Sequence, residues 1–325
     1  MAIREVRRAG LTMPINNPRF VNNSWLRNCD HITLDFEDSV PQSQKPYARI
    51  IAREAVGLAG QGGAAINIRI NQGFIEADVT AASWPGLSSL SMGHTWSADE
   101  VRLMDQYITR IERIRGLRPG SITLGAACDS PVGTVQSEEI VQASPRVKNF
   151  GGGGGYDYSM QLGVDMFVGF DQFVYPRGEG ALIARAFGKS FGISVHLPDT
   201  SGSVADAERS YLQAAANRKA GGRGGGGLHP NVVEPMIRGL TPPPEEVEQA
   251  RQVLAFYNEQ VEAKGEAEGE LDGLTVDKYE AARASELIEW AQACAEMDGK
   301  KERARREAIA RQEAAHTSPG QPTTA

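Results

Sequence analysis

The feature of this sequence that most constrains its fold is an alternation of short β-rich runs with longer helical patterns, which continues from the first residues to about residue 235. Such an alternation is typical of repeated βα units with parallel strands. Residues 97–114 and 179–192 are two of the helical stretches. Eight strands are expected, at residues 7–14, 31–38, 64–70, 87–94, 121–129, 146–152, 193–199 and 226–230. Eight strands favour an α/β fold closed into a (β/α)8 TIM barrel over an open doubly wound sheet.

The length and composition allow one large domain with an appendage, because 325 residues with 41% hydrophobic content can fill a barrel-sized core. We expect a TIM-barrel catalytic domain at 1–240, a C-terminal helical lid extension at 241–298, and a charged, partly disordered tail at 299–325.

Patterns inside the extension predict its elements. Residues 241–260 open with a proline run and acidic residues, which is typical of a helix start. A glycine- and glutamate-rich linker is expected at 262–273, and a second helix at 276–297. The alanine-rich, mixed-charge segment 300–315 predicts a solvated helix.

Several classes of protein are disfavoured. The net charge of -7 gives no support to broad nucleic-acid binding, which needs a basic face. There is no apolar run of membrane-spanning length and no signal-peptide pattern, so we expect a cytoplasmic protein that does not bind membranes. The three cysteines lack metal-ligand spacing, and we interpret them as buried small apolar residues.

Polar residues follow most of the expected strands, at the barrel face where connecting loops build active sites. The main ones are Asp35, Glu37, Asp38, Arg69, Asn71, Asp129, Ser130, Asp157 and His229. Any single acid has an alternative role as the N-cap of the next helix. His229, which precedes a proline, is interpreted as structural rather than catalytic.

Asp129 and Asp157 end neighbouring strands, so their two carboxylates could reach one hard cation. Magnesium takes one or two carboxylates together with waters and substrate oxygens. From spacing alone this signal is weak. Arg69 suits bidentate capture of a carboxylate. The alternative is that it pairs structurally with an acid of the 31–38 strand.

Two glycine-rich runs stand out, at 151–155 and 221–227. Glycine is costly inside a strand, so the first run indicates a close backbone approach to a ligand, with a flexible linker as the alternative. The amides of Gly154 and Gly155 would then donate to a substrate carboxylate or a developing oxyanion. The second run fits a ligand contact or packing of the closing strand equally well.

Taken in order, several segments resemble the motifs of citrate lyase β-subunit-like proteins of the HpcH/HpaI aldolase superfamily. LDFEDSV is similar to their LDLEDAV, NIRIN to VRVN, CDSPVGTVQSEEI to the ETPxG segment and FGGGGGYDYSMQLG to FGxxDLxxxLG. YPRGEGALIARAFG, GLHPNVVEPM and ELDGLTVDKYEAARASELI are similar to three later motifs, the last of them a lid. The resemblance covers about residues 7–290.

The resemblance implies a TIM barrel whose lid reaches a neighbouring subunit of a trimer or hexamer. It implies Mg²⁺ on Asp129 and Asp157, and a substrate carboxylate on Arg69. Asp277 corresponds to the lid acid–base group supplied in trans, and Glu37 and Asp38 to acids near the water shell of the metal. Arg7 and Arg8 correspond to a region that meets coenzyme A.

This chain departs from the pattern at three places near the barrel mouth. Asp129 stands where the family has glutamate, Gly93-His94 replaces a Pro-Lys pair, and GGGGLHP replaces GKWAIHP. These departures leave the identity of the substrate open.

The expected function is a Mg²⁺-dependent carbon–carbon lyase or aldolase that cleaves or forms a malyl-, citramalyl- or citryl-CoA type thioester, with an acyl-CoA and a 2-oxo acid as partners. The lid acid Asp277 would protonate the acyl-thioester enolate. Three alternatives stay open: a malyl-thioester hydrolase on the same site, a catalytically lapsed ligand-binding paralogue, and an aldolase that uses no coenzyme A.

Overall fold

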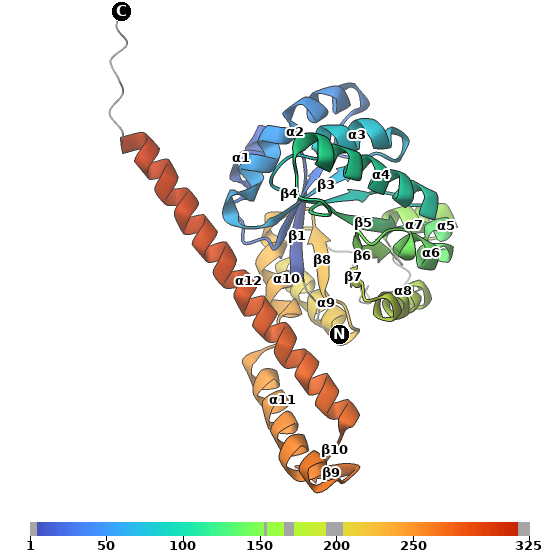
Figure 1. The fold of residues 1–325 in the computed structure, drawn as a ribbon, viewed down its shortest axis with the longest axis vertical. Coiled ribbons are helices and arrows are strands. Elements are labelled where there is room, and N and C mark those ends of the chain that lie inside the picture. The colour runs from blue at the N-terminus through green and yellow to red at the C-terminus, as the bar shows by residue number, and fades with distance from the viewer. Residues whose placement is uncertain (1–4, 153–154, 166–171, 193–203, 318–325) are drawn as a thin grey trace, which may run out of the picture.

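The computed structural model describes residues 5–152, 155–165, 172–192 and 204–317, and within this part eight parallel strands close into a barrel (Figure 1). The strands follow one another around the barrel in chain order, and β8 pairs with β1 to close it. They are β1 (Arg7–Pro14), β2 (His31–Asp35), β3 (Ala65–Ile70), β4 (Leu87–Met92), β5 (Thr123–Cys128), β6 (Val147–Gly152), β7 (Ser190–Gly192) and β8 (Gly224–Gly227). The predicted TIM barrel is confirmed.

The predicted positions of the last two strands were partly wrong. Strand β7 begins at Ser190, inside the stretch predicted as helical, and the predicted strand 193–199 lies outside the described residues. The preceding helix stops at Gly188, whose φ of 63° places it in the left-handed region that glycine adopts without strain. Strand β8 starts two residues before the predicted 226–230 run and ends at Gly227.

Helices cover the outside of the barrel. They are α1 (Pro18–Ser24), α2 (Lys45–Ala59), α3 (Ile75–Ala82), α4 (Ala98–Arg115), α5 (Pro131–Val135), α6 (Ser137–Gln142), α7 (Tyr156–Leu162), α8 (Val174–Phe187), α9 (Ala207–Lys219) and α10 (Val233–Leu240). The large apolar side chains of β2, β3 and β4 pack against α2, α3 and α4 in one core, and Ile32, Ile68 and Leu90 are fully buried there.

The opposite face of the same strands carries small and polar side chains. Asn67 Nδ2 donates to Ser91 Oγ at 2.8 Å, and Ser89 Oγ donates to Asn67 Oδ1 at 3.0 Å. A Cβ on Gly10 would overlap the ring of His31. Barrel interiors are more often filled by bulky branched residues. Here the small polar residues leave a cavity of about 830 Å³, lined by residues of β2, β3, β4, β6 and β8 among others.

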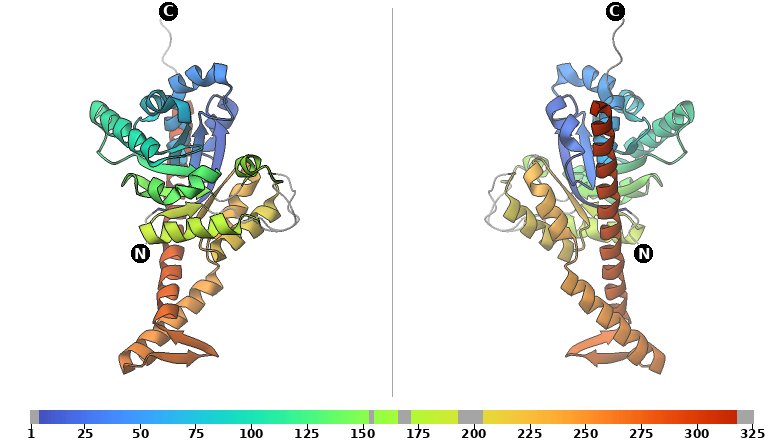
Figure 2. Two further views of the ribbon diagram at one scale, coloured as in Figure 1. Left: turned by 90° about the vertical axis from the view of Figure 1, so that its right-hand side faces the viewer. Right: turned by 90° about the vertical axis from the view of Figure 1, so that its left-hand side faces the viewer.

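The C-terminal extension projects beyond the barrel (Figures 1 and 2). It consists of α11 (Pro244–Phe256), the antiparallel hairpin β9 (Glu268–Leu271) and β10 (Leu274–Asp277), and α12 (Lys278–Thr317). The linker predicted at 262–273 is therefore partly a strand. Its turn, Asp272-Gly273, has φ values of 50° and 82°, which suit a two-residue hairpin turn.

Helix α12 runs without interruption across residue 298, and it lies along one side of the barrel in both figures. The domain boundaries at 240 and 298 stay a prediction. The expectation of a solvated helix at 300–315 needs correction, because Lys301 and Ala308 are buried. The described residues include no helix long and apolar enough to cross a membrane. Cys29, Cys128 and Cys294 are all buried, as predicted.

A buried charge network attaches α12 to the amino end of the barrel. Arg8 Nε and Nη2 donate to the two carboxylate oxygens of Asp30, at 2.8 and 3.0 Å. Arg8 also donates to Asp298, and Lys301 Nζ donates to Asp30 Oδ1 at 2.6 Å. The guanidinium of Arg8 is completely buried. Its donors are taken by Asp30, Thr241 and Asp298, near the start of β1, and the contact with coenzyme A stays a prediction.

Candidate functional site

The site lies where β2, β3, β4 and β5 end, at the carboxyl face of the barrel. Asp35 is the last residue of β2, and the loop after it carries Glu37 and Asp38. Arg69 is the penultimate residue of β3. His94 follows β4 and Asp129 follows β5. The parallel register brings these chain segments, which are far apart in sequence, to one edge.

Arg69 is held mainly by Asp35. Its Nε and Nη2 atoms donate to the two oxygens of the Asp35 carboxylate, both at 2.8 Å. Burial alone would raise the pKa of Asp35, but the Arg69 contacts outweigh it and lower that pKa. The structural pairing weighed as an alternative is thus present. The remaining Nη1 atom lies 2.7 Å from Glu37 Oε2 and 3.5 Å from Asp38 Oδ2, on the side of the mouth.

Glu37 is buried although it carries a carboxylate, with 8% of its surface exposed. Burial raises its pKa to about 7, against the opposing effect of Arg69. Its Oε2 atom takes no hydrogen bond despite the nearby guanidinium. Gly93 lies directly beside it, and a Cβ on Gly93 would lie 2.4 Å from Glu37 Oε1, so the carboxylate would have to shift. The departure at position 93 therefore gives the Glu37 carboxylate its space.

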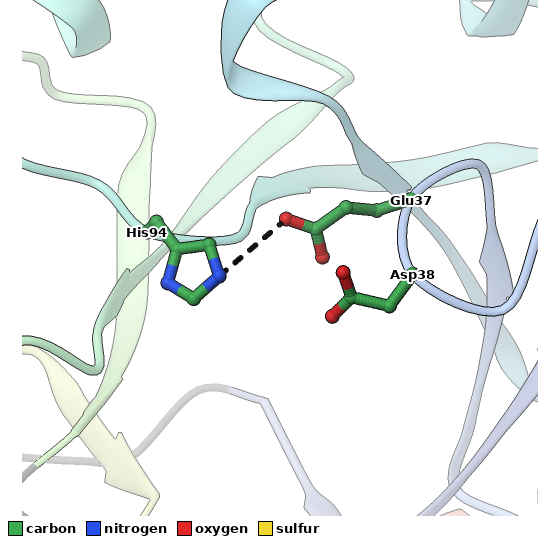
Figure 3. A group of neighbouring side chains, drawn as sticks. All are labelled: Glu37, Asp38 and His94. Atoms are coloured by element: carbon green, nitrogen blue, oxygen red, sulfur yellow. Dashed lines mark ion pairs between the residues drawn. The ribbon is translucent and has the colours of Figure 1, made fainter. Parts of the chain in front are cut away.

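His94 connects Glu37 to Asp129 (Figure 3 shows the Glu37 side). Its Nδ1 lies 3.1 Å from Asp129 Oδ1, and its Nε2 lies 4.0 Å from Glu37 Oε1. The backbone of His94 has a φ of 54°, unusual for a residue with a side chain. Burial alone would lower the pKa of His94, but Asp129, Glu37 and Asp157 outweigh it and raise that pKa.

Asp129 and Asp157 are the predicted magnesium pair. Burial raises the pKa of Asp129, with His94 acting against it and Asp157 adding to it. Asp157 is exposed in the first turn of α7. Its negative charge helps to raise the pKa of both Asp129 and His94. Among the described residues Asp157 has no ion pair.

The donor set fits a divalent cation. Among the described residues, five carboxylates lie at the mouth, those of Asp35, Glu37, Asp38, Asp129 and Asp157. They outnumber the cationic groups nearby, which include the guanidinium of Arg69, the imidazole of His94 and the ammonium of Lys45 on the carbonyls of Phe36 and Glu37. Glu37, Asp38 and His94 each offer one ligand atom, and these three atoms lie within 4.8 Å of one another. Carboxylate oxygens are the ligands that magnesium prefers.

The other predicted site residues lie elsewhere. Gly155 precedes α7 with a φ of 117°, and its carbonyl accepts from Ser159, while Gly154 lies outside the described residues. Asp277 ends β10, and its Oδ1 accepts from the amides of Tyr279 and Glu280, which caps α12. The hairpin that contains it projects away from the barrel of its own chain (Figure 1).

Two residues of the site were not among the predicted ligands. Asp35 is the anchor of Arg69, and His94 joins two acids. Both follow the same signal as the predicted residues, a polar side chain at the carboxyl end of a strand. A lone histidine has no spacing pattern that marks it from sequence.

Comparison with known proteins agrees with this geometry. The model of the family described as HpcH/HpaI aldolase/citrate lyase matches residues 8–229. Citrate lyase subunit beta of Haemophilus influenzae is 29% identical over 289 residues, covering 88% of this chain and 97% of that protein. The L-malyl-CoA/beta-methylmalyl-CoA lyase of Cereibacter sphaeroides is 26% identical over 305 residues, and the match covers 88% of this chain and 94% of that protein.

Among solved structures, the CitE protein of Mycobacterium tuberculosis in complex with magnesium, acetoacetate and coenzyme A superposes with a TM-score of 0.67 at 22% identity, covering 88% of this chain and 98% of that one. A citrate lyase from Burkholderia xenovorans gives a TM-score of 0.72 at 14% identity, and the match covers 92% of this chain and 97% of that one. At these identities the superpositions show the fold alone. The family match spans most of the chain, and this chain therefore belongs to the HpcH/HpaI aldolase/citrate lyase family, as a citrate lyase β-subunit-like lyase.

Proposed function

We propose that this lyase cleaves or forms the carbon–carbon bond of a 3-hydroxyacyl-CoA of the malyl-, citramalyl- or citryl-CoA type, with an acyl-CoA and a 2-oxo acid as the other partners. The observation that carries the proposal is the barrel mouth, where an excess of carboxylates surrounds an arginine with one donor atom turned to the opening. The names of the relatives, citrate lyase and malyl-CoA lyase, support the substrate class.

We assign the cation to Mg²⁺, held by Asp129 and Asp157, with Glu37 and Asp38 beside it. The magnesium complexes of the related CitE protein support this choice. When bound, magnesium supplies Lewis acidity and a template for the 2-oxo acid. The excess of carboxylates at the mouth is the feature of this chain that suits it.

Arg69 binds the substrate carboxylate with Nη1, which is not bonded to Asp35 and which exchanges its contacts with Glu37 and Asp38 for the substrate. The bidentate contact with Asp35 fixes the guanidinium plane, so little side-chain freedom is lost when substrate arrives. The amides of Gly154 and Gly155 are proposed to donate to the same carboxylate or to the developing oxyanion. Glu37 is buried and the Arg69 side chain is about one-quarter exposed, so contacts between these two groups are stronger than they would be in bulk water.

In the cleavage direction the hydroxyl group releases its proton to solvent, the bond between the hydroxyl-bearing carbon and the thioester α-carbon breaks, and the 2-oxo acid forms. The electron pair remains on the thioester as an enolate. Asp277, which takes up a proton from solvent, donates it to the enolate carbon, so one proton leaves and one proton enters. Because Asp277 lies on a hairpin that projects from its own barrel, we propose a homo-oligomer in which it serves a neighbouring subunit.

The cation and oxo-acid site can be tested by isothermal titration of glyoxylate, pyruvate and oxaloacetate into the protein, with and without Mg²⁺. We expect binding that requires both Mg²⁺ and Asp157, and therefore its loss in Asp157→Ala. Asp165→Ala is the matched control, because Asp165 is an exposed acid shortly after α7. Equal binding by wild type and Asp157→Ala would remove Asp157 from the site.

A further inference from the structure

A cleft of about 560 Å³ lies between the barrel and the C-terminal extension, where α11 and α12 leave the barrel (Figures 1 and 2). One wall is formed by the end of α9 and the loop before β8, and the other by α11, β10 and α12. Among the described residues it shares no lining residue with the barrel mouth. Ligand pockets commonly measure about 300–1,000 Å³ and often lie between domains. The cleft therefore has the size and the location of a second binding site.

The apolar surface of the cleft comes mainly from the extension. The apolar side chains that line it are those of Pro242, Ala250, Val253, Leu274, Ala284, Leu287 and Trp290. Most of them belong to the small core that joins α11, β10 and α12, or pack against it. Because the removal of apolar surface from water is favourable, this wall favours a ligand with an apolar body.

Several of the charged groups in the cleft are already paired. Arg218 donates to both carboxylate oxygens of Glu246, at 2.6 and 2.9 Å. Arg283 Nη2 donates to Glu280 Oε2 at 2.6 Å. Lys219, on the barrel side, is exposed and has no ion pair among the described residues. Its ammonium is therefore available to a ligand.

Arg223 is a second cation whose donors are only partly used. Its Nη1 donates to the carbonyl of Gly222 at 3.2 Å, and its buried Nε takes no hydrogen bond. The carboxylate of Glu286 lies 3.6 Å from Nη2, which exceeds hydrogen-bond distance, and both of its oxygens accept from Arg185 at 2.8 and 2.7 Å. Since a guanidinium carries five N–H groups, Arg223 keeps donors for an anion.

The surroundings of Arg223 are short of negative charge. Burial is the main cause that lowers its pKa, and the positive charges of Arg185 and Arg218 lower it further, while Glu286 acts in the opposite direction. The guanidinium carbon lies 5.5 Å from the ring centroid of Trp290, a contact that helps to hold the side chain in place. An anion at this wall would offset the repulsion among the arginines.

The glycine-rich run at 221–227 supplies the backbone of this wall. Gly221 lines the cleft with a φ of 91°, a conformation that favours glycine. A Cβ on Gly224 would lie 2.3 Å from the carbonyl oxygen of Arg7, so this glycine allows β8 to close against β1. The run therefore combines packing of the closing strand with the turn that presents Arg223.

We propose that this cleft is a second binding site for a small amphiphilic anion, whose carboxylate or phosphate pairs with Arg223 and Lys219 and whose apolar body lies against the extension. The inference goes beyond the proposed function, because the site is separate from the barrel mouth and needs no magnesium. A ligand bound here contacts both walls and stabilises the contact between the barrel and the extension.

Isothermal titration calorimetry in the presence of a chelator tests the ligand class. Hexanoate and hexyl phosphate are the two anionic probes, 1-hexanol has the apolar body without the charge, and acetate has the charge without the body. We expect one of the two hexyl anions to bind at one per chain, and the tighter of them identifies the head group. Hexanol and acetate should bind at least about tenfold more weakly, since a hydrogen bond to a charged group is worth roughly that factor. Equal binding of hexanol, or no binding of either hexyl anion, overturns the proposal.

Two variants test the assigned cations. Arg223→Gln should lower the affinity for the tighter anion by about tenfold. Lys219→Gln should lower it as well, and because Lys219 is exposed this variant keeps the test valid if Arg223→Gln fails to fold by circular dichroism. Arg251→Gln is the matched control, since Arg251 is an exposed arginine of α11 that pairs with Glu248 outside the cleft. Wild-type affinity in folded Arg223→Gln and Lys219→Gln would refute the site.

Two further measurements separate this site from the mouth. Asp157→Ala should bind the anion as the wild type does, because Asp157 does not line the cleft. Loss of binding in that variant would place the anion at the mouth and overturn the inference. The bound anion should also slow amide hydrogen exchange in α11 and in the first turns of α12, which form one wall. Exchange that is unchanged at saturation would contradict a ligand between the barrel and the extension.

Discussion

Gly93 packs directly against the carboxylate of Glu37. A Cβ at this position would lie 2.4 Å from Glu37 Oε1, so Gly93→Ala should displace the carboxylate. A shift of about 1 Å in a positioned group can cost on the order of a hundredfold in turnover. We expect that loss in kcat with Tm almost unchanged, as measured by steady-state kinetics and thermal unfolding.

Gly57→Ala is the control for that change. Gly57 lies inside α2, and a Cβ there would meet nothing within 4 Å. Alanine is favoured over glycine inside helices by roughly 0.5–1 kcal/mol, so this variant should be slightly more stable and fully active. Unchanged turnover in Gly93→Ala would show that the Glu37 carboxylate tolerates displacement.

Single residues of the site could be predicted from the sequence only where they follow the carboxyl end of a strand. Arg69, Asp129 and the acids after β2 were found because polar side chains at strand ends meet at one edge. The structural pairing of Arg8 was not predicted, because its partner Asp298 lies 290 residues away in the chain. Local sequence carries no information on such a contact.

At the scale of elements, Lys301 holds α12 against the barrel. Its ammonium is fully buried and donates to Asp30 Oδ1 at 2.6 Å and to the carbonyl of Asn28 at 3.0 Å. Lys301→Met keeps the length of the side chain but removes its charge. Breaking a buried ion pair costs about 3–5 kcal/mol. Because Arg8 still pairs with Asp30 in this variant, we expect the free energy of unfolding, measured in urea, to fall by about 3 kcal/mol.

Lys300→Met is the neighbouring control, because Lys300 is exposed on the same helix. It should change the free energy of unfolding by less than about 0.5 kcal/mol. Equal stability of the two variants would mean that the buried network does not hold α12 in place.

Glu112 links α4 to β5 and β6, and it gives the stability a pH dependence. Burial alone would raise its pKa, but bonds from Arg146 and from the amides of Ile122 and Gly120 outweigh it and lower that pKa below its ordinary 4.5. Because the pKa of Glu112 is lower in the folded protein than in the unfolded chain, the ionised carboxylate stabilises the fold at pH values above the unfolded-state pKa. This stabilisation is lost as the pH falls through the folded-state pKa.

Urea unfolding of the wild type and Glu112→Gln over a series of pH values tests this dependence. The variant should be less stable by roughly 3 kcal/mol at pH 7, because Arg146 loses a buried partner. The difference should narrow as the pH falls below 4.5. Glu139→Gln, at an exposed acid, should follow the wild type. A constant difference at every pH would contradict the assigned role.

Elements were predicted well where hydrophobic periodicity is strong, as in the first six strands. The hairpin β9–β10 was missed because its glycine- and glutamate-rich sequence lacks apolar alternation, although Asp272-Gly273 is a hairpin turn signal. The start of β7 was misplaced because Lys189-Ser190-Phe191-Gly192 continues a helical pattern after the true cap at Gly188.

At the scale of the whole molecule, Asp277 raises the question of how subunits share a site. Asp277→Asn removes the acid but keeps an oxygen that can cap α12, since asparagine is a good N-cap. We expect this variant to be folded and inactive. Asp157→Ala is expected to be inactive as well. When the two variants are refolded together, part of the activity should return, because some mixed oligomers contain a site with Asp157 from one subunit and Asp277 from its neighbour. Persistent inactivity of the mixture would place both residues in one subunit or outside catalysis.

Product analysis of the reaction tests the proposed lyase activity most directly. Malyl-, citramalyl- and citryl-CoA are incubated with the protein, with Mg²⁺ or with a chelator, and acyl-CoA, free coenzyme A and 2-oxo acid are quantified by mass spectrometry. We expect at least one thioester to give acyl-CoA and 2-oxo acid in equal amounts, only when the cation is present. Release of free coenzyme A with the hydroxy acid intact, or no turnover of any of the three thioesters, would contradict it.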